Sequence, residues 1–497
     1  MEVLYKSTRG DGSCVTASQA ILQGLSKDGG LFVPTSIPAL DLDLEQAAEM
    51  EYKDLAFHVM SRFFSDFTDE ELKNCIDNAY DSKFDTEEIA PVVKKSGTYY
   101  LELFHGATIA FKDMALSILP HLLTTAARKN NITNDIVILT ATSGDTGKAA
   151  LAGFADVPGT KIVVFYPDGG VSNIQRLQMV TQKGDNTCVI AVKGNFDDCQ
   201  TAVKKMFNDA RLGSELNEKG FQFSSANSIN IGRLIPQVVY YVWAYTRLVK
   251  QGAIKCGDLI NFVVPTGNFG NILAGYYAKL MGLPVNRFIC ASNDNKVLFD
   301  FFQTGTYDKN REFILTNSPS MDILVSSNLE RLIYMIAGES EEKNRALMEQ
   351  LSKEGRYTIT DEMRSRLKDF TGVYASDEES LAEIRKVYDA SDYIMDTHTA
   401  VAACGYEKYR AETGDETPTV IVSTASPFKF LKAVLSVIDP EHVDKLSIWD
   451  LVWRLDELRG KKGLPKAIKE IMAFPIRHKT VCEIDGMEQE VKNFLGI

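Results

Sequence analysis

Short, nearly continuous apolar runs alternate with helical patterns along most of the chain. Six of these runs read DIVILTAT, KIVVFYP, TCVIAVKG, LINFVVPTG, RFICASN and TVIVSTA. Runs rich in Val and Ile, each followed by a loop and a helix, are typical of strands buried on both faces of a parallel sheet. Because such strands are too many for one compact sheet, we expect an α/β fold with two sheets around a cleft.

Near the N-terminus the pattern has a helical period instead. In the acidic segment 40–80, apolar positions recur at near-helical intervals, at Leu55, Val59, Met60 and Phe63. We therefore expect a separate, mainly helical N-terminal domain over residues 1–92. A charged helical pattern returns at 338–370, and we expect that segment to lie on the surface.

Composition and charge narrow the class of protein. The chain has 497 residues, of which 45% are hydrophobic and 24% charged, as is usual for a globular protein. The formal net charge of -13 argues against broad binding to nucleic acid or to anionic membranes. Its 8 cysteines are scattered, so neither a disulfide framework nor a metal site is expected. The start MEVLYKSTRGDGSC lacks a secretory pattern and no apolar run reaches about 18 residues, so we expect a cytoplasmic protein.

One lysine stands directly behind an apolar approach, in the segment HGATIAFKD. Lys112 follows Ile109, Ala110 and Phe111, although an ammonium group is strongly hydrated and normally stays in water. The simplest interpretation is a surface lysine whose stem lies along a buried Phe. The alternative is an amine held in a water-poor cleft for a chemical purpose.

A glycine-rich loop follows the predicted strand 136–142. Its polar side chains are Ser143, Asp145 and Thr146. Glycines allow backbone amides to turn toward an anion at a helix N-terminus, and hydroxyl groups add donors, so the loop suits a carboxylate or phosphate. It is not a P-loop, because Thr142 and Ala149 stand where that motif needs Gly and then Ser or Thr. A plain turn into a helix that starts near Lys148 remains the alternative.

Two further loops follow predicted strands. After strand 260–264, a turn contains Gly267, Asn268, Phe269, Gly270 and Asn271. Such a turn can hold one phosphate group, and it lacks the G-x-G-x-x-G spacing of dinucleotide-binding folds. At the end of strand 420–422, Ser423 and Thr424 lie where ligands gather in α/β sheets, although such hydroxyl groups also serve as helix caps.

The lysine behind the apolar approach and the two glycine-containing loops together predict a phosphorylated cofactor with an aldehyde. A lysine in an apolar cleft can bind the aldehyde covalently, and the loops can hold anionic groups. Pyridoxal 5'-phosphate meets this description, and it accepts electrons from carbon atoms next to the substrate nitrogen. Each feature by itself is a weak signal, since Gly and Asn are common in any tight turn.

With these residues assembled, the chain resembles the threonine synthases, in the longer form found in yeast and many bacteria. Matching segments occur in the family's order over nearly the whole chain, namely GLSKDGGLFVP, LELFHGATIAFKD, ATSGDTG, SSANSINIGRLIPQ, VVPTGNFGNILAGY, SPSMDILVSSNLERL, DTHTAVA and STASPFKF. The resemblance implies the tryptophan-synthase-β-like fold (fold type II), pyridoxal phosphate, and conversion of O-phospho-L-homoserine and water to L-threonine and phosphate. It also implies a monomer with a large domain of 93–112 and 241–497 and a small domain of 113–240.

The same resemblance implies roles for single residues at the cofactor. Lys112 matches the lysine that binds the cofactor covalently, and the turn 267–271 looks like the cradle of its phosphate. Thr424 matches the hydroxyl group that faces the pyridine nitrogen. Because a neutral hydroxyl cannot keep the ring protonated as a carboxylate would, it should favour elimination over transamination.

Substrate contacts follow from the resemblance in the same way. Ser143, Asp145 and Thr146 are similar to the loop that receives the substrate's carboxylate. Asn230 and Arg233, within NSINIGR, are candidates for the substrate's phosphate, since Arg suits bidentate contact. The alternative is that Arg233 only ties a helix to the protein surface.

Four positions depart from the family's pattern. Ala107 replaces Pro, Lys148 replaces a small residue, Thr397 replaces Pro and Ser426 replaces His. The cofactor residues survive these changes, but the choice of substrate is put in doubt. A related pyridoxal-phosphate lyase that releases phosphate and yields a keto acid is therefore the alternative to threonine synthase. A non-catalytic protein that binds small anions is a third interpretation, against which the intact Lys112 and Thr424 argue.

Overall fold

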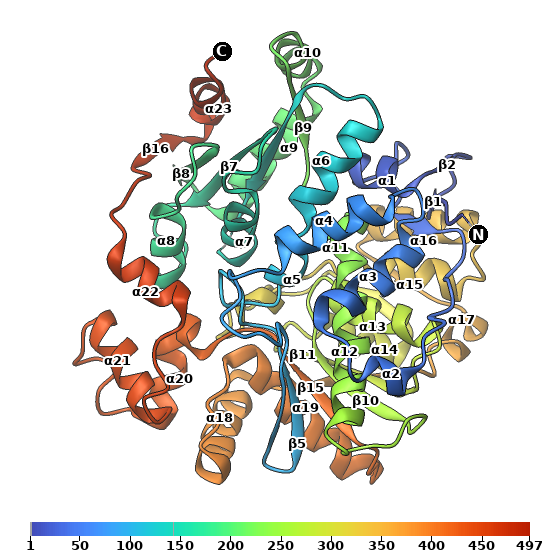
Figure 1. The fold of residues 1–497 in the computed structure, drawn as a ribbon, viewed down its shortest axis with the longest axis vertical. Coiled ribbons are helices and arrows are strands. Elements are labelled where there is room, and N and C mark those ends of the chain that lie inside the picture. Colours follow the sequence, from blue (N-terminus) through green and yellow to red (C-terminus); the bar gives the residue numbers. More distant parts are fainter. Residues whose placement is uncertain (1, 143) are drawn as a thin grey trace.

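Two mainly parallel sheets form the framework of the molecule, as the alternating pattern predicts. The structure is a computed structural model that describes residues 2–142 and 144–497. The larger sheet has the strand order β14-β11-β10-β15-β5-β4 and the smaller sheet has the order β16-β8-β7-β6-β9. Figure 1 labels β5, β10, β11 and β15 in the first sheet and β7, β8, β9 and β16 in the second. The expected α/β class with two sheets is thus confirmed.

The larger sheet carries two of the predicted loops. Its strands are β4 Val92–Lys95, β5 Thr98–Glu102, β10 Ile260–Pro265, β11 Val285–Ser292, β14 Phe370–Tyr374 and β15 Thr419–Ser423. All pairs are parallel except that β4 is antiparallel to β5. Every residue of β10 and β15 is buried, which explains their continuous apolar sequences. Since β10 and β15 pair in parallel, the loops that follow them meet at one edge.

Helices cover this sheet, and an extension with its own two-stranded sheet packs against them. The helices are α12 Pro236–Lys250, α13 Gly270–Leu280, α14 Val297–Thr304, α18 Asp377–Ser391, α19 Thr397–Thr413, α20 Leu431–Ile438 and α21 Ile448–Leu458, with the 3-10 turns η1 Pro319–Met321 and η2 Pro427–Phe430. The extension contains β12 Thr306–Asp308, α15 Leu329–Ile336, α16 Glu341–Glu354, β13 Arg356–Thr358 and α17 Asp361–Ser365. The charged segment 338–370 therefore supplies helices α16 and α17 but also a strand between them.

The smaller sheet is parallel throughout. Its strands are β6 Asp135–Ala141, β7 Thr160–Pro167, β8 Thr187–Lys193, β9 Phe221–Ser224 and β16 Thr480–Glu483. Its surroundings include α5 Asp113–Leu116, α6 Leu119–Lys129, α7 Asp145–Phe154, α8 Asn173–Val180, α9 Phe196–Asn208, α10 Ala210–Glu218, α11 Ile231–Leu234, α22 Lys466–Ala473, η3 Ile484–Gly486 and α23 Met487–Leu495.

The end of the chain returns to this smaller sheet, which corrects one expected boundary. Residues 480–497 were expected in the larger domain. Instead, β16 pairs with β8, and Met487 and Val491 belong to the core of the smaller sheet, with exposed fractions of 1% and 0%. Burial of these two side chains explains why α23 packs there.

The N-terminal unit combines helices with a small antiparallel sheet. It contains β1 Tyr5–Ser7, β2 Cys14–Val15, α1 Ala17–Gln23, β3 Phe32–Pro34, α2 Leu44–Ala47, α3 Tyr52–Phe63 and α4 Asp69–Ala79. The predicted apolar face of α3 is fully buried, since Leu55, Val59, Met60 and Phe63 are each 0% exposed. Helix α3 packs against α12, where Tyr52 meets the ring of Trp243 edge-on at 5.3 Å.

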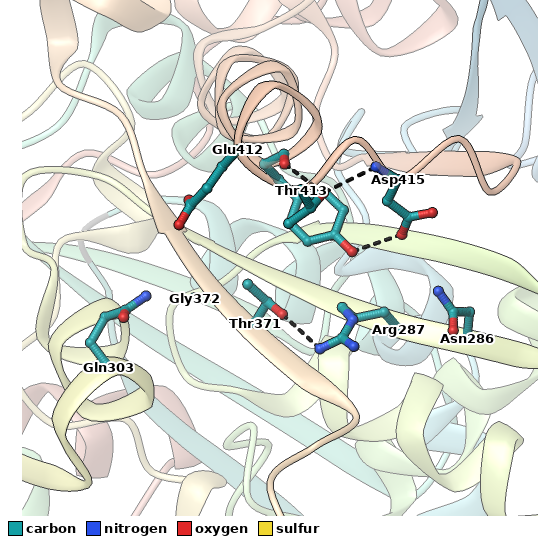
Figure 2. A pocket seen from close by; sticks show the side chains of 9 residues that line it. Asn286, Arg287, Gln303, Thr371, Gly372, Glu412, Thr413 and Asp415 are labelled. Atoms are coloured by element: carbon teal, nitrogen blue, oxygen red, sulfur yellow. Dashed lines mark hydrogen bonds between the residues drawn. The ribbon is translucent and has the colours of Figure 1, made fainter.

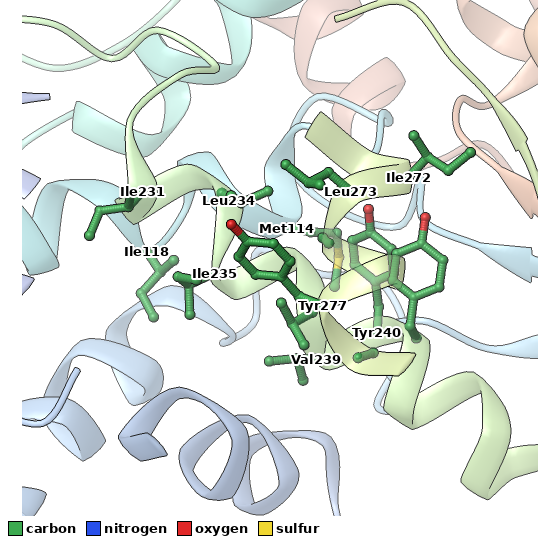
Figure 3. Packing of buried hydrophobic residues seen from close by; sticks show 14 of the residues in the cluster. Met114, Ile118, Ile231, Leu234, Ile235, Val239, Tyr240, Ile272, Leu273 and Tyr277 are labelled. Carbon is green, nitrogen blue, oxygen red and sulfur yellow. The ribbon is translucent and has the colours of Figure 1, made fainter. Parts of the chain in front are cut away.

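A central core holds the element that follows Lys112. Helix α12 is buried on all sides from Pro236 to Leu248, as expected for a helix that is apolar all round. In Figure 3, Val239 and Tyr240 of α12 lie in the same cluster as Leu273 of α13 and Met114 of α5. Since α5 begins at Asp113, this core fixes the backbone directly after Lys112.

Candidate active site

The loop that carries Lys112 is tied to the end of β15 by backbone hydrogen bonds. The N–H of Phe111 donates to the carbonyl of Thr424 at 2.7 Å, and the N–H of Ser426 donates to the carbonyl of Ile109 at 3.0 Å. These bonds place the lysine beside the strand end where Thr424 lies. Two segments about three hundred residues apart in sequence are thus joined at one edge of the larger sheet.

Lys112 is largely buried, so the surface interpretation of this lysine is wrong. Its side chain is 13% exposed; Nζ donates to Oγ of Ser320 at 3.4 Å and lies 3.9 Å from Oδ2 of Asp145. Burial lowers the pKa of Lys112 to about 8; Asp145 raises it, and Lys429 and Arg233 lower it further. A far larger share of this amine is therefore neutral near neutral pH than in free lysine.

Asp145 is the hub of the buried polar groups. Its Oδ1 accepts from Nζ of Lys429 at 2.8 Å and from Nε2 of Gln175 at 3.0 Å, and its Oδ2 accepts from Oγ of Ser320 at 3.1 Å. Burial opposes its ionisation, but the charges of Lys429 and Lys112 more than offset this and hold the pKa of Asp145 well below its usual range. Asp145 is therefore an ionised carboxylate that orients both lysines.

The turn at 267–271 presents backbone amides at the start of α13. Within the described part of the chain, none of these five N–H groups donates to a protein acceptor. Ser326 and Asn328 instead bind carbonyl oxygens of the turn, at 2.7 and 3.0 Å, which fixes its shape. A Cβ at Gly267 would lie 2.8 Å from the carbonyl oxygen of Ser320, so the close approach requires glycine. The arrangement fits a phosphate group at a helix N-terminus.

Arg233 is a buried cation without a matching anion. Its residue is 4% exposed, Nη1 donates to the carbonyl of Ala226 at 2.9 Å, and Nε has no partner among the described residues. Burial lowers the pKa of Arg233 to about 10, and its charge in turn lowers the pKa of Lys112. Because Arg233 is buried, the alternative that it only ties a helix to the protein surface is wrong. A buried guanidinium that lacks a carboxylate partner suits an anionic ligand.

Asn230 lies next to this cation but its side chain is used within the protein. Oδ1 accepts from the N–H of Gly232 at 2.8 Å and so caps α11, and Nδ2 donates to the carbonyl of Ile21 at 2.9 Å. The residue is 1% exposed. These contacts give Asn230 the role of holding the segment that carries Arg233 in place.

The remaining predicted site residues have hydroxyl side chains and come at the ends of two strands in the sequence. Ser143 lies outside the described residues. Thr146 is half-buried in the first turn of α7. Thr424 is buried and tied to the lysine loop, whereas the hydroxyl of Ser423 bonds to that of Thr399 at 3.1 Å. Of the two hydroxyls at this strand end, Thr424 is thus the one available to a ligand.

Three side chains of this site were missed by sequence reasoning, namely Gln175, Ser320 and Lys429. Lys429 is fully buried and also donates to the carbonyl of Thr108 at 3.0 Å. Its sequence SPFKF shows the same signal that drew attention to Lys112, a lysine next to Phe in apolar surroundings. Gln175 and Ser320 carry no such signal, because only the fold brings them to Asp145.

Of the four positions that depart from the family's pattern, two lie at one pocket and two lie in other elements. Ala107 and Lys148 line one pocket of about 160 Å³. Lys148 is 8% exposed and donates to Oε1 of Gln182. Ser426 caps η2 by accepting from a backbone N–H at 3.4 Å, and Thr397 is buried in the first turn of α19. The first two departures are therefore neighbours, although they lie far apart in sequence.

A larger hollow lies at the opposite edge of the six-stranded sheet. Its volume is about 360 Å³, and it is lined by residues at the amino ends of β11 and β14, including Arg287 and Thr371 (Figure 2). Arg287 donates to the hydroxyl of Thr371 at 3.1 Å, and Tyr409 donates to Asp415 at 2.7 Å. None of the predicted site residues lines it. Since ligands of such sheets bind at the carboxyl ends of strands, it is not the candidate active site.

The described residues show neither a metal cluster nor a membrane-spanning helix. Within 2–142 and 144–497, no cluster of three or more His, Cys, Asp or Glu is placed to hold a metal ion. No helix in these ranges has the length and apolar character needed to cross a membrane. The described cysteines are free.

Three family models match the chain in sequence order. A model described as threonine synthase N terminus matches residues 4–80, and a model described as pyridoxal-phosphate dependent enzyme matches residues 90–425. A third, described as threonine synthase, C-terminal, matches residues 399–494. The second model alone covers more than half of the chain and includes Lys112, the turn at 267–271 and Thr424.

The curated proteins similar to this chain are named threonine synthase or threonine synthase-like 1. Human threonine synthase-like 1 is 40% identical over 443 residues, which is 86% of this chain but only 59% of that protein. The chain thus spans about three fifths of the length of this relative. Threonine synthase of Schizosaccharomyces pombe is 39% identical, covering 87% of this chain and 89% of the relative, and that of Saccharomyces cerevisiae is 34% identical, covering 95% and 98%.

Solved structures agree with this likeness over the whole chain. A pyridoxal-phosphate-bound threonine synthase from Brucella melitensis superposes with a TM-score of 0.87 at 32% identity and covers 100% of both chains. Yeast threonine synthase superposes with a TM-score of 0.88 at 32% identity and covers 99% of both chains. The expected fold type II architecture is thereby confirmed. The chain belongs to the threonine synthase family of pyridoxal-phosphate-dependent enzymes.

Proposed function

We propose that this protein is a threonine synthase that converts O-phospho-L-homoserine and water into L-threonine and phosphate. The observation that carries the proposal is the buried group of Lys112, Asp145 and Arg233. It combines an amine of lowered pKa with a cation that has no anionic partner among residues 2–142 and 144–497. A phosphorylated amino acid offers both a carbon acid for the amine and an anion for the guanidinium.

The residues present fit pyridoxal phosphate. The amides of 267–271 donate to no acceptor in the described part of the chain and can receive its phosphate, and the space beside Gly267 is too narrow for any side chain. Lys112 would hold the aldehyde, and Thr424 would face the pyridine nitrogen. When bound, the cofactor supplies an electron-withdrawing ring that makes the α-proton of the substrate easier to remove.

Lys112 is the residue that moves protons in this proposal. Its neutral amine takes a proton from Cα of the substrate, and then one from Cβ as the phosphate group leaves from Cγ. Cγ then gains a proton, hydroxide from water adds at Cβ, and Cα regains its proton, so that the amine both accepts and returns protons. Burial supports this role, because it favours the neutral amine. Asp145 and Ser320 orient Nζ from one side, so the amine is held without being permanently paired at short distance.

The substrate's two anionic groups have different candidate partners. Arg233 suits the phosphate, because its charge is buried and unmatched among the described residues. The carboxylate suits the hydroxyl and amide donors of the loop that includes Ser143 and Thr146. Asp145 is a poor direct partner for it, since two carboxylates repel each other and its oxygens already accept from protein donors.

The direct test is to incubate the purified protein with O-phospho-L-homoserine and to measure threonine and phosphate together. Equal amounts of the two products are expected. A keto acid formed with the phosphate would instead support the related lyase, and no product at all would support a non-catalytic anion-binding protein. Lys112→Ala should abolish either reaction and serves as the control.

The covalent role of Lys112 has a test that needs no substrate. Borohydride reduction followed by proteolysis should leave the cofactor attached to the peptide that contains Lys112, because reduction fixes a C=N bond at that side chain. Mass spectrometry identifies the peptide. Attachment to Lys148 or Lys429 would contradict the proposal.

We further propose a small-molecule substrate as the main partner, a monomer in solution and a cytoplasmic location. The net charge of -13 disfavours nucleic acid and anionic membranes as partners. Light scattering after size-exclusion chromatography measures the oligomeric state, and a mass of twice 55.2 kDa would contradict the monomer. Cell fractionation tests the location.

A further inference from the structure

The pocket that Ala107 and Lys148 share lies behind the active-site lysine loop. It has a volume of about 160 Å³, and its walls come from α7, α8 and α22. Helices α8 and α22 lie side by side (Figure 1). A single water needs only about 10–15 Å³ of such space, so the pocket has room for a small organic molecule.

One wall of this pocket contains polar groups that need a partner. Gln178 is 0% exposed, and neither the oxygen nor the nitrogen of its side-chain amide has a hydrogen-bond partner among the described residues. Lys148 is 8% exposed and donates to Gln182, but no carboxylate pairs with it in the described part of the chain. An unmatched ammonium beside an unpartnered amide favours a bound carboxylate.

Helix α22 contributes the other sign of charge to the pocket lining. Glu470 of α22 is half-buried, and its negative charge acts on Lys148, yet it forms no ion pair among the described residues. At the rim, Nζ of Lys183 lies 3.4 Å from the centre of the Phe474 ring, which closes one side. A pocket with an ammonium on one side and a carboxylate on the other matches a zwitterion.

We propose that this pocket binds a small α-amino acid, whose carboxylate is held by Lys148 and Gln178 and whose ammonium is held by Glu470. This site is separate from the proposed catalytic one. Lys148 donates to Gln182, whereas Asp145 accepts from Lys429, and the pocket lining includes none of Lys112, Asp145 and Lys429. The charge of Lys429 nevertheless acts on Lys148.

A ligand in this pocket would contact the elements that position the catalytic groups. Lys148 lies one helical turn after Asp145 on α7, and Gln178 lies one turn after Gln175, which hydrogen-bonds Asp145. Ala107 precedes Thr108, whose side chain and N–H bind Asp113 at 2.6 and 2.8 Å. The amino acid would therefore act as an effector, through both the helices and the loop.

Binding is measured by calorimetry on the borohydride-treated protein, in which an amine can no longer exchange at the active-site lysine. The probes are fragments of one molecule: L-alanine carries both charged groups, propionate keeps only the carboxylate and ethylamine keeps only the ammonium. L-alanine should bind more tightly than either. Lys148→Met and Glu470→Gln should each weaken binding of L-alanine about tenfold or more. Lys469→Met, an exposed lysine on the same helix α22, is the matched control and should leave binding unchanged.

Several outcomes would overturn the proposal. One is the absence of L-alanine binding, and another is equal binding by the parent and both variants of the pocket. If sulfate binds as tightly as L-alanine and Glu470→Gln changes nothing, the pocket is a simple anion site. Because no turnover is measured, each of these outcomes is independent of whether the protein makes threonine.

Discussion

At the scale of single residues, the candidate active site is governed by an excess of buried positive charge. Lys429 and Arg233 both act electrostatically on Lys112, and Asp145 forms ion pairs with the two lysines. Arg233 is left without a carboxylate in the described residues. A substrate with a doubly negative phosphate would complete this charge balance.

Arg233 is therefore the residue whose removal should affect substrate most selectively. Arg233→Ala should lower turnover of O-phospho-L-homoserine roughly 30-fold or more, because losing the partner of a buried phosphate costs on the order of 2–5 kcal/mol. The visible spectrum of the cofactor should not change. Arg233→Lys keeps the charge but loses the planar set of N–H donors of the guanidinium, so its turnover should lie between that of the parent and that of Arg233→Ala. Normal activity of Arg233→Ala would remove this residue from the site, and a lost spectrum would give it a structural role.

The lowered pKa of Lys112 predicts the pH at which its amine becomes reactive. Below a pH of about 8 the ammonium form dominates and is not nucleophilic, and above it the neutral amine dominates. In cofactor-free protein, the rate at which pyridoxal 5'-phosphate attaches to Lys112 should thus rise with pH to half its maximum near 8. Absorbance after rapid mixing measures this rate. A midpoint near the ordinary lysine value of 10.5 would contradict the burial argument.

At the scale of elements, the turn before α13 is the most sequence-sensitive part of the site. Gly267→Ala would place a Cβ 2.8 Å from a backbone oxygen, which cannot move away as a flexible side chain can. The variant should fold but lose cofactor more readily, as measured by absorbance after dialysis. Gly213→Ala is the control, because its Cβ would meet nothing within 4 Å. Equal cofactor retention by both variants would argue against a phosphate at this turn.

Helix α23 should matter for stability even though it lies far from the site. Met487 is 1% exposed in the core of the smaller sheet, so Met487→Ala should lower the free energy of unfolding by about 2–5 kcal/mol. Gln489→Ala, on the exposed side of the same helix, should change it by less than about 0.5 kcal/mol. Urea unfolding followed by circular dichroism compares the two. Similar midpoints would mean that α23 is only loosely attached.

The elements that the sequence predicts are those whose burial shows in a local pattern. Strands β10 and β15 are buried along their whole length, and the apolar runs at 260–264 and 420–422 reveal them. Strand β16 has mostly exposed side chains, so nothing in its sequence distinguishes it from a loop. Strand β13 interrupts a charged segment that is otherwise typical of helices.

In the candidate site, too, some residues show in a local sequence pattern and others do not. Lys112 and the turn at 267–271 are visible in the sequence, because an apolar approach and paired glycines are local features. The contacts of Ser320 and Lys429 with Asp145 depend on the packing of distant segments, which no local pattern encodes. Asn230 shows a second limit of local patterns, because an Asn next to a candidate arginine is also a common helix cap, and its role toward the substrate stays a prediction.

At the scale of the whole molecule, the buried ion pair of Lys429 with Asp145 helps to join the two sheets. Lys429 comes from the region of the larger sheet and Asp145 from the smaller, with exposed fractions of 0% and 4%. Breaking such a pair leaves a buried charge and typically costs about 3–5 kcal/mol. Lys429→Met should therefore lower the melting temperature clearly, whereas Lys353→Met, in an exposed pair with Glu349, should not.

A double-mutant comparison separates the ion pair from other effects of these side chains. Asp145→Asn should also lower the melting temperature, because it leaves Lys429 buried without its anion. The melting temperature of the double variant should fall by less than the sum of the two single decreases, because neither charge is then left buried without its partner. Additive losses would show that Lys429 and Asp145 contribute independently. Scanning calorimetry measures all three variants.

The pairing of β16 with β8 has a consequence for how the chain is made. Lys193 and Glu483, which bridge the two strands at 2.8 Å, are separated by 290 positions. At roughly 5–20 residues per second, a ribosome needs on the order of 15–60 s to cover that interval. During this time β8 is an uncovered edge of a parallel sheet, where a foreign strand could add. The nascent protein should thus depend on chaperone protection until β16 emerges.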